Sequence, residues 1–325
     1  MTPRRTFLGG LLTGTLLTGT LLTAMTLARS AEAQEVPSGG PLVLAMYAPS
    51  APLPSADARF AYLEKIAQKL QSAGIPTQGK VFAKAADLES AVKKGQVDLA
   101  ILDPLYMADR GGGYNILAVA TSSGDVFLRW GLYTHLPTGN ILDMANKRLA
   151  WVAPSGKEPT YIGNVMLYGE LRATYFQLRP AAPDMSAAVS DVVLRRADCV
   201  FAPEAAVAGK QLRKAYDAGE AGRIPNPALV QISTRMSSET LANIKKTLAG
   251  FNTTGVLDGW RTGGSVSETF RSLRSRLRGR ADRNLVMAEP QRLSTQVNSA
   301  MIQSMELTPQ QPGLRVLIIP PEGIP

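Results

Sequence analysis

One pattern occurs twice in this chain, about a hundred residues apart, and it constrains the fold more than any other feature. Residues 91–104 read AVKKGQVDLAILDP, and residues 192–204 read VVLRRADCVFAPE. Each copy is the end of an amphipathic helix, then a basic pair, an aspartate, a short apolar run and a proline. Apolar runs of this length are typical of strands that are buried on both faces of a sheet. Two helix–strand units built alike therefore predict two α/β lobes.

The two copies also indicate where a ligand would lie. Ligands of open α/β sheets bind beyond the carboxyl ends of the strands, and Asp103 and Glu204 fall at those ends. We therefore expect a central cleft between the lobes, lined from both sides.

The remaining elements follow from periodicity and from capping residues. A helix over 57–73 is expected to bury Phe60, Leu63, Ile66, Ala67 and Leu70, and to end at Gly74. A second helix begins at Ser237 or Ser238 and ends at Gly250. Strands are predicted over 42–46, 80–82, 97–102, 114–121, 127–134, 147–152 and 229–233.

The first 33 residues read as an export signal. Arg4 and Arg5 precede an uncharged stretch over 7–28, and the segment ending at Ala33 supplies a small-x-small cleavage site. The basic pair resembles the twin-arginine motif that exports folded proteins, while an ordinary secretory signal and an uncleaved anchor are the alternatives. We expect cleavage near Ala33 and a periplasmic location.

The charge of the chain favours an anionic ligand over a nucleic acid. Removing three arginines and one glutamate with the signal from 35 basic and 26 acidic residues lowers the net charge from +9 to +7. This excess is spread along the chain rather than gathered in a stripe. The densest basic run, over 271–283, is interpreted as a solvated helix face, with an interaction patch as the alternative.

The residue inventory gives no positive support for catalysis. The chain has a single histidine, His135, and a single cysteine, Cys199, which excludes an internal disulfide and is expected to be a buried, inert thiol. HExxH, CxxC, GxSxG, GxGxxG and phosphate-loop motifs do not occur. We therefore expect that the protein is not an enzyme and that it binds no metal and no organic cofactor. The alternative is a periplasmic enzyme that uses Asp103 and Glu204 as its acid and base.

Donors suited to an anion gather at a predicted helix start. Ser155 and Thr160 follow a predicted strand, and a helix N-terminus offers N–H groups with a favourable dipole. Ser186 opens the next helix, and Tyr47 and Tyr106 are expected to reach the cleft from the first lobe. In the alternative interpretation, Ser155 and Thr160 only cap the turn and the helix. The two tyrosines then belong to the core.

Four stretches of the chain carry a resemblance to a known family: Asp87–Tyr106, Asn146–Tyr161, Ala197–Phe201 and the helix from Ser237 with residues 255–260 after it. In this order they resemble the type II periplasmic phosphate/phosphite/phosphonate substrate-binding family, the solute receptors of ABC importers. The resemblance runs from about Leu42 to Trp260. It implies a two-lobed type II periplasmic-binding-protein fold with two crossover strands.

The resemblance also implies a function and a set of contacts. The protein would capture a small, anionic, phosphonate- or phosphate-like molecule by closing its lobes, as a monomer that delivers the ligand to an ABC permease in the inner membrane. The family's serine and threonine cluster is reduced here to Ser155 and Thr160, so a different anion, an amide or an organic acid is also open. With the residues argued above, the expected ligand set is Tyr47, Asp103, Tyr106, Ser155, Thr160, Tyr161, Ser186 and Asp198.

The expected domains are an export signal over 1–33, lobe one over 34–126 and 234–285, lobe two over 127–233, and a C-terminal extension over 286–325. Closure would bend the chain at 127–134 and 229–233. A sensor module that presents its closed state to a membrane receptor is the alternative within binding proteins. The extension could instead dock a partner.

Overall fold

The computed structural model describes residues 40–111, 113–155, 159–219, 222–263 and 266–279. The predicted export signal, the extension over 286–325 and residues 156–158 of the predicted donor turn lie outside the described residues. None of the helices within the described ranges combines the length and the apolar character that a membrane crossing needs.

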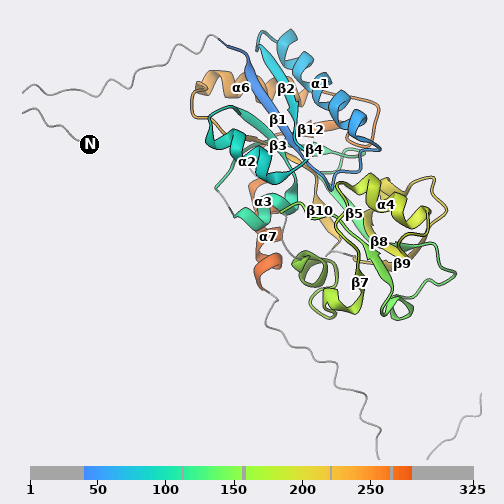
Figure 1. The fold of residues 1–325 in the computed structure, drawn as a ribbon. Helices are drawn as coiled ribbons and strands as arrows, with labels where there is room; N and C mark the ends of the chain where they lie inside the picture. The colour runs from blue at the N-terminus through green and yellow to red at the C-terminus, as the bar shows by residue number, and fades with distance from the viewer. Residues whose placement is uncertain (1–39, 112, 156–158, 220–221, 264–265, 280–325) are drawn as a thin grey trace, which may run out of the picture. The chain divides into compact units, whose positions relative to one another are not determined.

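Two mixed sheets, each of six strands within the described residues, organise the fold (Figure 1). The first has the order β12-β4-β11-β3-β1-β2, in which β1 pairs in parallel with β2 and β3, while β11 and β12 run antiparallel to their partners. Its strands are β1 (Leu42–Tyr47), β2 (Thr77–Val81), β3 (Leu99–Leu102), β4 (Asn115–Thr121), β11 (Ala228–Gln231) and β12 (Gly259–Arg261). We call this sheet and its helices lobe one.

The second sheet has the order β10-β5-β8-β6-β7, with β9 paired to β5. The strands β6, β7 and β8 run parallel, and β5 runs antiparallel to β8, β9 and β10. Its strands are β5 (Phe127–Thr134), β6 (Arg148–Ala150), β7 (Gln177–Leu178), β8 (Cys199–Pro203), β9 (Arg213–Asp217) and β10 (Arg223–Pro225). We call this sheet and its helices lobe two.

The helices confirm the predicted helix start at Ser237 and the predicted helix end at Gly74. Ser55, Asp103, Asp184 and Ser237 each accept a backbone N–H at the start of a helix. Gly74 has a φ of 80°, in the left-handed region where glycine is favoured. The helices are α1 (Ala56–Ser72), α2 (Ala85–Lys93), α3 (Pro104–Arg110), α4 (Met185–Val193), α5 (Glu204–Val207), α6 (Ser238–Ala249) and α7 (Val266–Gly279).

The repeated sequence pattern forms two equivalent units, α2–β3–α3 in lobe one and α4–β8–α5 in lobe two. Every residue of β3 and of β8 is buried, as the unbroken apolar runs predicted. The prediction of two α/β lobes is therefore confirmed.

Within the part of the chain that the structure describes, the chain crosses between the two sheets twice. β4 leads into β5 through residues 122–126, and β10 leads into β11 through Asn226 and Pro227. Asn226 is fully buried and ties the two crossings together, because its backbone N–H donates to Val126 O at 2.8 Å and its Nδ2 donates to Asp125 O at 3.0 Å. Since β11 pairs with β3 and β4, the chain returns to lobe one before Ala228 and not after 233.

The buried stripe of α1 differs from the expectation at one residue. Phe60 is 53% exposed, and Tyr62 is buried in its place. The helix contacts α6. The Tyr62 ring packs against Phe251, which follows α6, and against Trp260 of β12. The expectation for Phe60 was wrong, because the position of these neighbours decides which edge of the stripe is covered.

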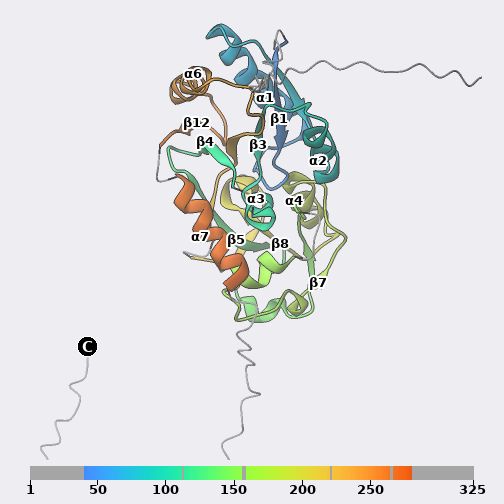
Figure 2. The same cartoon turned by 90° about the vertical axis from the view of Figure 1, so that its left-hand side faces the viewer.

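The helix α7 contacts both lobes (Figure 2). Phe270 packs in a cluster of lobe one, whereas Leu273 is fully buried in the core of lobe two. Asn164 Nδ2 of lobe two donates to Leu277 O at 2.9 Å. The part of the basic run that lies in α7, from Arg271 to Gly279, therefore has one face that joins the lobes, so the interpretation of this part as a solvated face is incomplete.

Candidate functional site

The candidate site lies where the carboxyl ends of strands from both sheets meet. Tyr47 is the last residue of β1, and Pro154 follows β6 by four residues. The Tyr47 hydroxyl donates to Pro154 O at 2.6 Å. This hydrogen bond joins lobe one to lobe two at the edges where open α/β sheets bind ligands.

Tyr47 is held on its lobe-one side by Tyr106 of α3. The two rings meet edge to face, with centroids 5.3 Å apart at 75°, and both residues are buried. Burial raises the pKa of Tyr47, so its hydroxyl keeps its proton and acts as a donor at neutral pH.

Asp103 is fully buried and caps α3. Its Oδ1 accepts from Leu105 N at 3.0 Å, and its Oδ2 accepts from Ser50 N at 2.8 Å and from Ser50 Oγ at 2.5 Å. Burial raises the pKa of Asp103 against the effect of these donors. The carboxyl group thus holds the loop after β1 in place, and Ser50 is a residue that the sequence reasoning missed.

Glu204 lies in a different environment from Asp103. Its side chain is 62% exposed at the start of α5, and its carboxylate lies 4.0 Å from Lys214 Nζ. Asp103 is covered by its own chain while Glu204 faces solvent. We therefore find no geometric support here for the acid–base pair that was weighed as an alternative.

Tyr106 belongs to a polar cluster on lobe one that the sequence did not single out. Its hydroxyl donates to Glu89 Oε1 of α2 at 3.3 Å, and Arg110 Nη2 pairs with the same oxygen at 2.5 Å. The Arg110 guanidinium also lies 5.6 Å from the Tyr106 ring centroid. The spacing of Tyr106 and Arg110 on one helix is a local signal for this contact, whereas Glu89 comes from another helix.

The lobe-two part of the site follows β6. Tyr161 is buried, and its hydroxyl donates to Val152 O at 2.9 Å. Thr160 beside it is exposed, and Ser155 is partly exposed. Thr160 and Tyr161 begin a short helical segment that continues as a π-helical turn over Ile162–Met166, so a helix start is found where the sequence predicted one.

Ser186 lies in the first turn of α4 and contacts the other lobe. Its Oγ donates to Pro54 O at 2.6 Å, and the adjacent Met185 N donates to Pro49 O at 2.8 Å. A cavity of about 210 Å³ lies beside these contacts. It is lined from both lobes, by Leu53, Pro54 and Val256 of lobe one and by Ser186, Val189 and Lys210 of lobe two.

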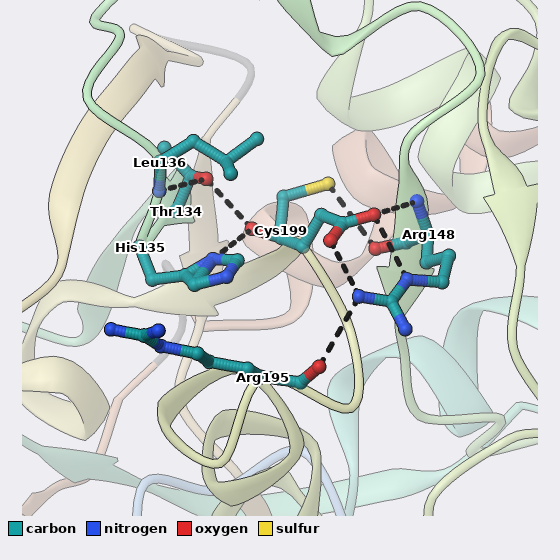
Figure 3. A network of polar contacts seen from close by, with 7 residues as sticks. Thr134, His135, Leu136, Arg148, Arg195 and Cys199 are labelled. Carbon is teal, nitrogen blue, oxygen red and sulfur yellow. Dashed lines mark hydrogen bonds and ion pairs between the residues drawn. The ribbon is translucent and has the colours of Figure 1, made fainter.

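Asp198 directly precedes β8, so it lies at the opposite end of this strand from the candidate site. Figure 3 shows Thr134 and Arg148 in the network of polar contacts at this end. Its Oδ2 accepts from Arg148 N at 2.8 Å, and its Oδ1 accepts from Arg148 Nη2 at 2.7 Å. Thr134 Oγ1 donates to Asp198 O at 2.7 Å. Asp198 therefore joins β5, β6 and β8, and we leave it out of the proposed ligand contacts.

Asp98 makes the same arrangement in lobe one. Its Oδ2 accepts from Val43 N of β1 at 2.8 Å, and Arg235 donates to both of its carboxylate oxygens. In each copy of the repeat the aspartate thus fastens the start of the neighbouring strand and binds an arginine. The repeated aspartate is explained by architecture.

His135 and Cys199 take part in the network around Asp198. His135 Nδ1 lies 3.4 Å from Asp198 O, and the buried Cys199 Sγ lies 3.7 Å from Arg148 O. Burial raises the pKa of the Cys199 thiol to about 12, which keeps it protonated and unreactive, as expected. Among the described residues, no group of histidine, cysteine and carboxylate side chains could hold a metal ion.

The Arg148 guanidinium holds the pKa of Asp198 below its usual range, and this leads to a testable expectation. Because the pKa in the folded state is lowered, the pair contributes stability above the unfolded-state pKa of about 3.9, and this contribution is lost as the pH falls. In Arg148→Gln the pKa of Asp198 is expected to rise, measured by NMR titration of the carboxyl carbons.

The same titration contains its control. Gly219 N donates to Asp217 Oδ1 at 2.9 Å and lowers the pKa of that carboxyl group without Arg148. Asp217 should titrate alike in both proteins. An unchanged pKa of Asp198 in Arg148→Gln would contradict the assignment.

Comparison with known proteins adds information on the fold. No protein-family model and no curated protein sequence matches the chain. Solved structures do match. The binding-protein component of an ABC phosphonate transporter from Pseudomonas aeruginosa has 13% identity and a TM-score of 0.55, over 82% of this chain and 94% of that chain.

Two further matches have similar extent. The PhnD1 protein of Prochlorococcus marinus, in complex with methylphosphonate, has 10% identity and a TM-score of 0.57, over 74% of this chain and 98% of that chain. A Xanthomonas citri protein bound to ATP has 12% identity and a TM-score of 0.51, over 74% of this chain and 98% of that chain. With its two mixed sheets joined by two crossings, the chain has the fold of type II periplasmic binding proteins, as the resemblance implied.

Proposed function

We propose that this protein is an extracytoplasmic solute-binding protein that captures a small anionic molecule, phosphonate- or phosphate-like, for an ABC importer by closing its lobes. The observation that supports this most is the hydrogen bond from Tyr47 to Pro154 O, which joins the ligand-binding edges of the two sheets. The fold shared with a phosphonate-transporter component and with a methylphosphonate complex supports the same ligand class. Periplasmic location and partnership with an inner-membrane permease are part of the proposal.

The mechanism follows from the two crossings. Lobe one would present Tyr47 and Tyr106, and lobe two would present Ser155, Thr160 and Tyr161. A ligand that contacts both sets binds the closed arrangement more tightly than the open one, so it shifts the population toward closure. The chain would bend at residues 122–126 and at Asn226, where few residues connect the sheets.

The polar groups of the site suit an anion. Tyr47 and Tyr161 each donate their single proton to a backbone carbonyl, Pro154 O and Val152 O, and burial raises the pKa of each hydroxyl, so neither side chain carries a negative charge that would repel a bound anion. Asp103 accepts hydrogen bonds from three donors of its own chain, so its carboxyl group is already satisfied and is not needed for a ligand. Thr160 is exposed at a helix start, where an anion would meet its hydroxyl and the N-terminal N–H groups.

A thermal-shift screen with phosphate, phosphite, methylphosphonate, alkylsulfonates and carboxylates tests the proposal. A ligand at a hundred times its dissociation constant adds about 2.7 kcal/mol to the unfolding free energy. For a domain of this size that corresponds to a rise in melting temperature of several degrees, on the order of 5 °C. We expect such a rise with at least one phosphorus oxyanion.

The variant Thr160→Ala, compared with the parent protein in the same screen, tests the proposed ligand contact. It removes one hydroxyl from an exposed position, so the melting temperature without ligand should stay nearly unchanged. Loss of a hydrogen bond to a charged ligand weakens binding by about tenfold or more. A screen in which no anion raises the melting temperature, or in which Thr160→Ala responds like the parent, would contradict the proposed ligand class or the proposed contact, respectively.

A further inference from the structure

An ion pair joins the two lobes at the start of two helices. Arg59 lies in the first turn of α1 in lobe one, and Asp184 is the N-cap of α4 in lobe two. Arg59 Nη2 lies 2.6 Å from Asp184 Oδ2. Their side chains are only 14% and 15% exposed, so water screens this pair less than it screens pairs on the open surface.

The two oxygens of Asp184 have different roles. Oδ1 accepts from Ala187 N at 2.8 Å and so caps α4 within lobe two, while Oδ2 accepts from Arg59 of lobe one. The cap can form whether or not the lobes touch, because all of its atoms belong to one lobe. The ion pair exists only when the lobes are together. The same residue therefore carries a contact within its lobe and a contact between lobes.

The pair lies beside two other contacts between the lobes. Met185 N donates to Pro49 O at 2.8 Å, and Ser186 Oγ donates to Pro54 O at 2.6 Å. These three contacts come from consecutive residues, 184–186, and none of their partners in lobe one is a residue of the proposed ligand set. Separating the lobes at this place breaks all three contacts and leaves Arg59 without its carboxylate partner.

We infer that the Arg59–Asp184 pair is a latch that sets the fraction of closed molecules, and that it therefore determines ligand affinity without touching the ligand. Only the part about affinity rests on the proposed function. The closed state gains the free energy of the pair, and the open state does not. The apparent affinity for a ligand that binds the closed state rises with the fraction of molecules already closed.

The test measures the distance between the lobes directly. Cys199 is the only cysteine and is buried, so cysteines introduced at the exposed positions Gln68 of α1 and Val193 of α4 can be labelled selectively. Distance distributions come from double electron–electron resonance of spin labels at these two positions, with no small molecule added. The latch variants are Arg59→Gln and Asp184→Asn, and the second keeps an oxygen for the α4 cap.

The expected result is a larger population at long distance in both variants. A partly buried pair at the upper end of the range for ion pairs changes the ratio of open to closed molecules by about 3- to 10-fold. The control is Arg196→Gln, which removes an arginine that pairs with Asp191 at 3.8 Å within lobe two. It should leave the distribution unchanged, and a double variant Arg59→Gln/Asp184→Asn should open no further than either single variant.

Unchanged distances in both latch variants would overturn the inference. Binding of methylphosphonate to the same samples, measured by calorimetry, then separates the latch from the proposed function. If the variants bind methylphosphonate about 3- to 10-fold more weakly, in step with the change in distance, the latch controls affinity. If the distances change but methylphosphonate binds to none of the proteins, the latch is upheld and the proposed ligand fails.

Discussion

Replacing Arg235 by alanine is expected to lower the unfolding free energy by about 3–4 kcal/mol, because it leaves a buried carboxylate without its counter-ion. Asp98 is 2% exposed at the start of β3, and Arg235 donates to both of its oxygens. Val43 N of β1 is the other donor to this carboxylate. The loss should appear in urea unfolding followed by circular dichroism.

Two variants make this expectation specific. Arg261→Ala removes another arginine of lobe one, whose Nη2 donates to Gly124 O at 2.7 Å on the surface and which, among the described residues, binds no buried carboxylate. It should change the unfolding free energy by less than about 1 kcal/mol. In Arg235→Ala/Asp98→Asn the buried charge is removed as well, and part of the stability should return. Equal effects of Arg235→Ala and Arg261→Ala would contradict the role assigned to Asp98.

The second large effect is expected at Tyr47. Truncation to alanine removes a buried ring that packs on Tyr106, which should lower the unfolding free energy by about 3–4 kcal/mol. It also removes the hydrogen bond to Pro154 O across the lobes. We expect binding of the anion found in the screen to weaken at least about 30-fold, which is about 2 kcal/mol. Calorimetry at a temperature where the variant is folded measures this.

Tyr47→Phe separates the hydroxyl from the ring. It keeps the contact with Tyr106 and loses only the donor, so its unfolding free energy should fall by about 1 kcal/mol. Its affinity should lie between those of the parent and the alanine variant. A phenylalanine variant that binds as tightly as the parent would show that the hydroxyl has no part in closure or in ligand contact.

Much of the architecture could be predicted from the sequence because its signals are local. The repeated pattern around Asp98 and Asp198 marks two buried strands, and each follows a helix as predicted. The helix start at Ser237 was also predicted, because a cap bonds to a backbone N–H only a few residues away.

The features that could not be predicted depend on groups that are distant in sequence. Arg59 and Asp184 are separated by 125 residues, and no local pattern indicates that they meet. The exposure of Phe60 depends on where α6 and β12 pack. Asp198 precedes a buried strand, and the sequence alone does not distinguish a residue that binds a ligand there from one that holds a neighbouring strand. Its contact with Arg148 of β6 shows that it holds a strand.

The positions of several candidate site residues in the fold were predicted in outline, while their role in binding stays a prediction. Tyr47, Tyr106, Thr160 and Tyr161 lie at strand ends or helix starts, as expected, since parallel strands place their carboxyl ends at one edge of a sheet. The internal partners of these side chains, such as Ser50 on Asp103 and Glu89 on Tyr106, come from other elements. They belong to the tertiary structure and leave no local signal.

The crystal structure of the protein in complex with the anion identified in the screen tests the central claim most directly. The account predicts that the anion lies between the lobes, with a hydrogen bond from Thr160 and in contact with at least one of Tyr47 and Tyr106. The backbone angles of the two crossings, at 122–126 and at Asn226, should differ from those in a crystal of the free protein. An anion bound to one lobe alone, or at the contact between α3 and α7, would contradict capture by closure.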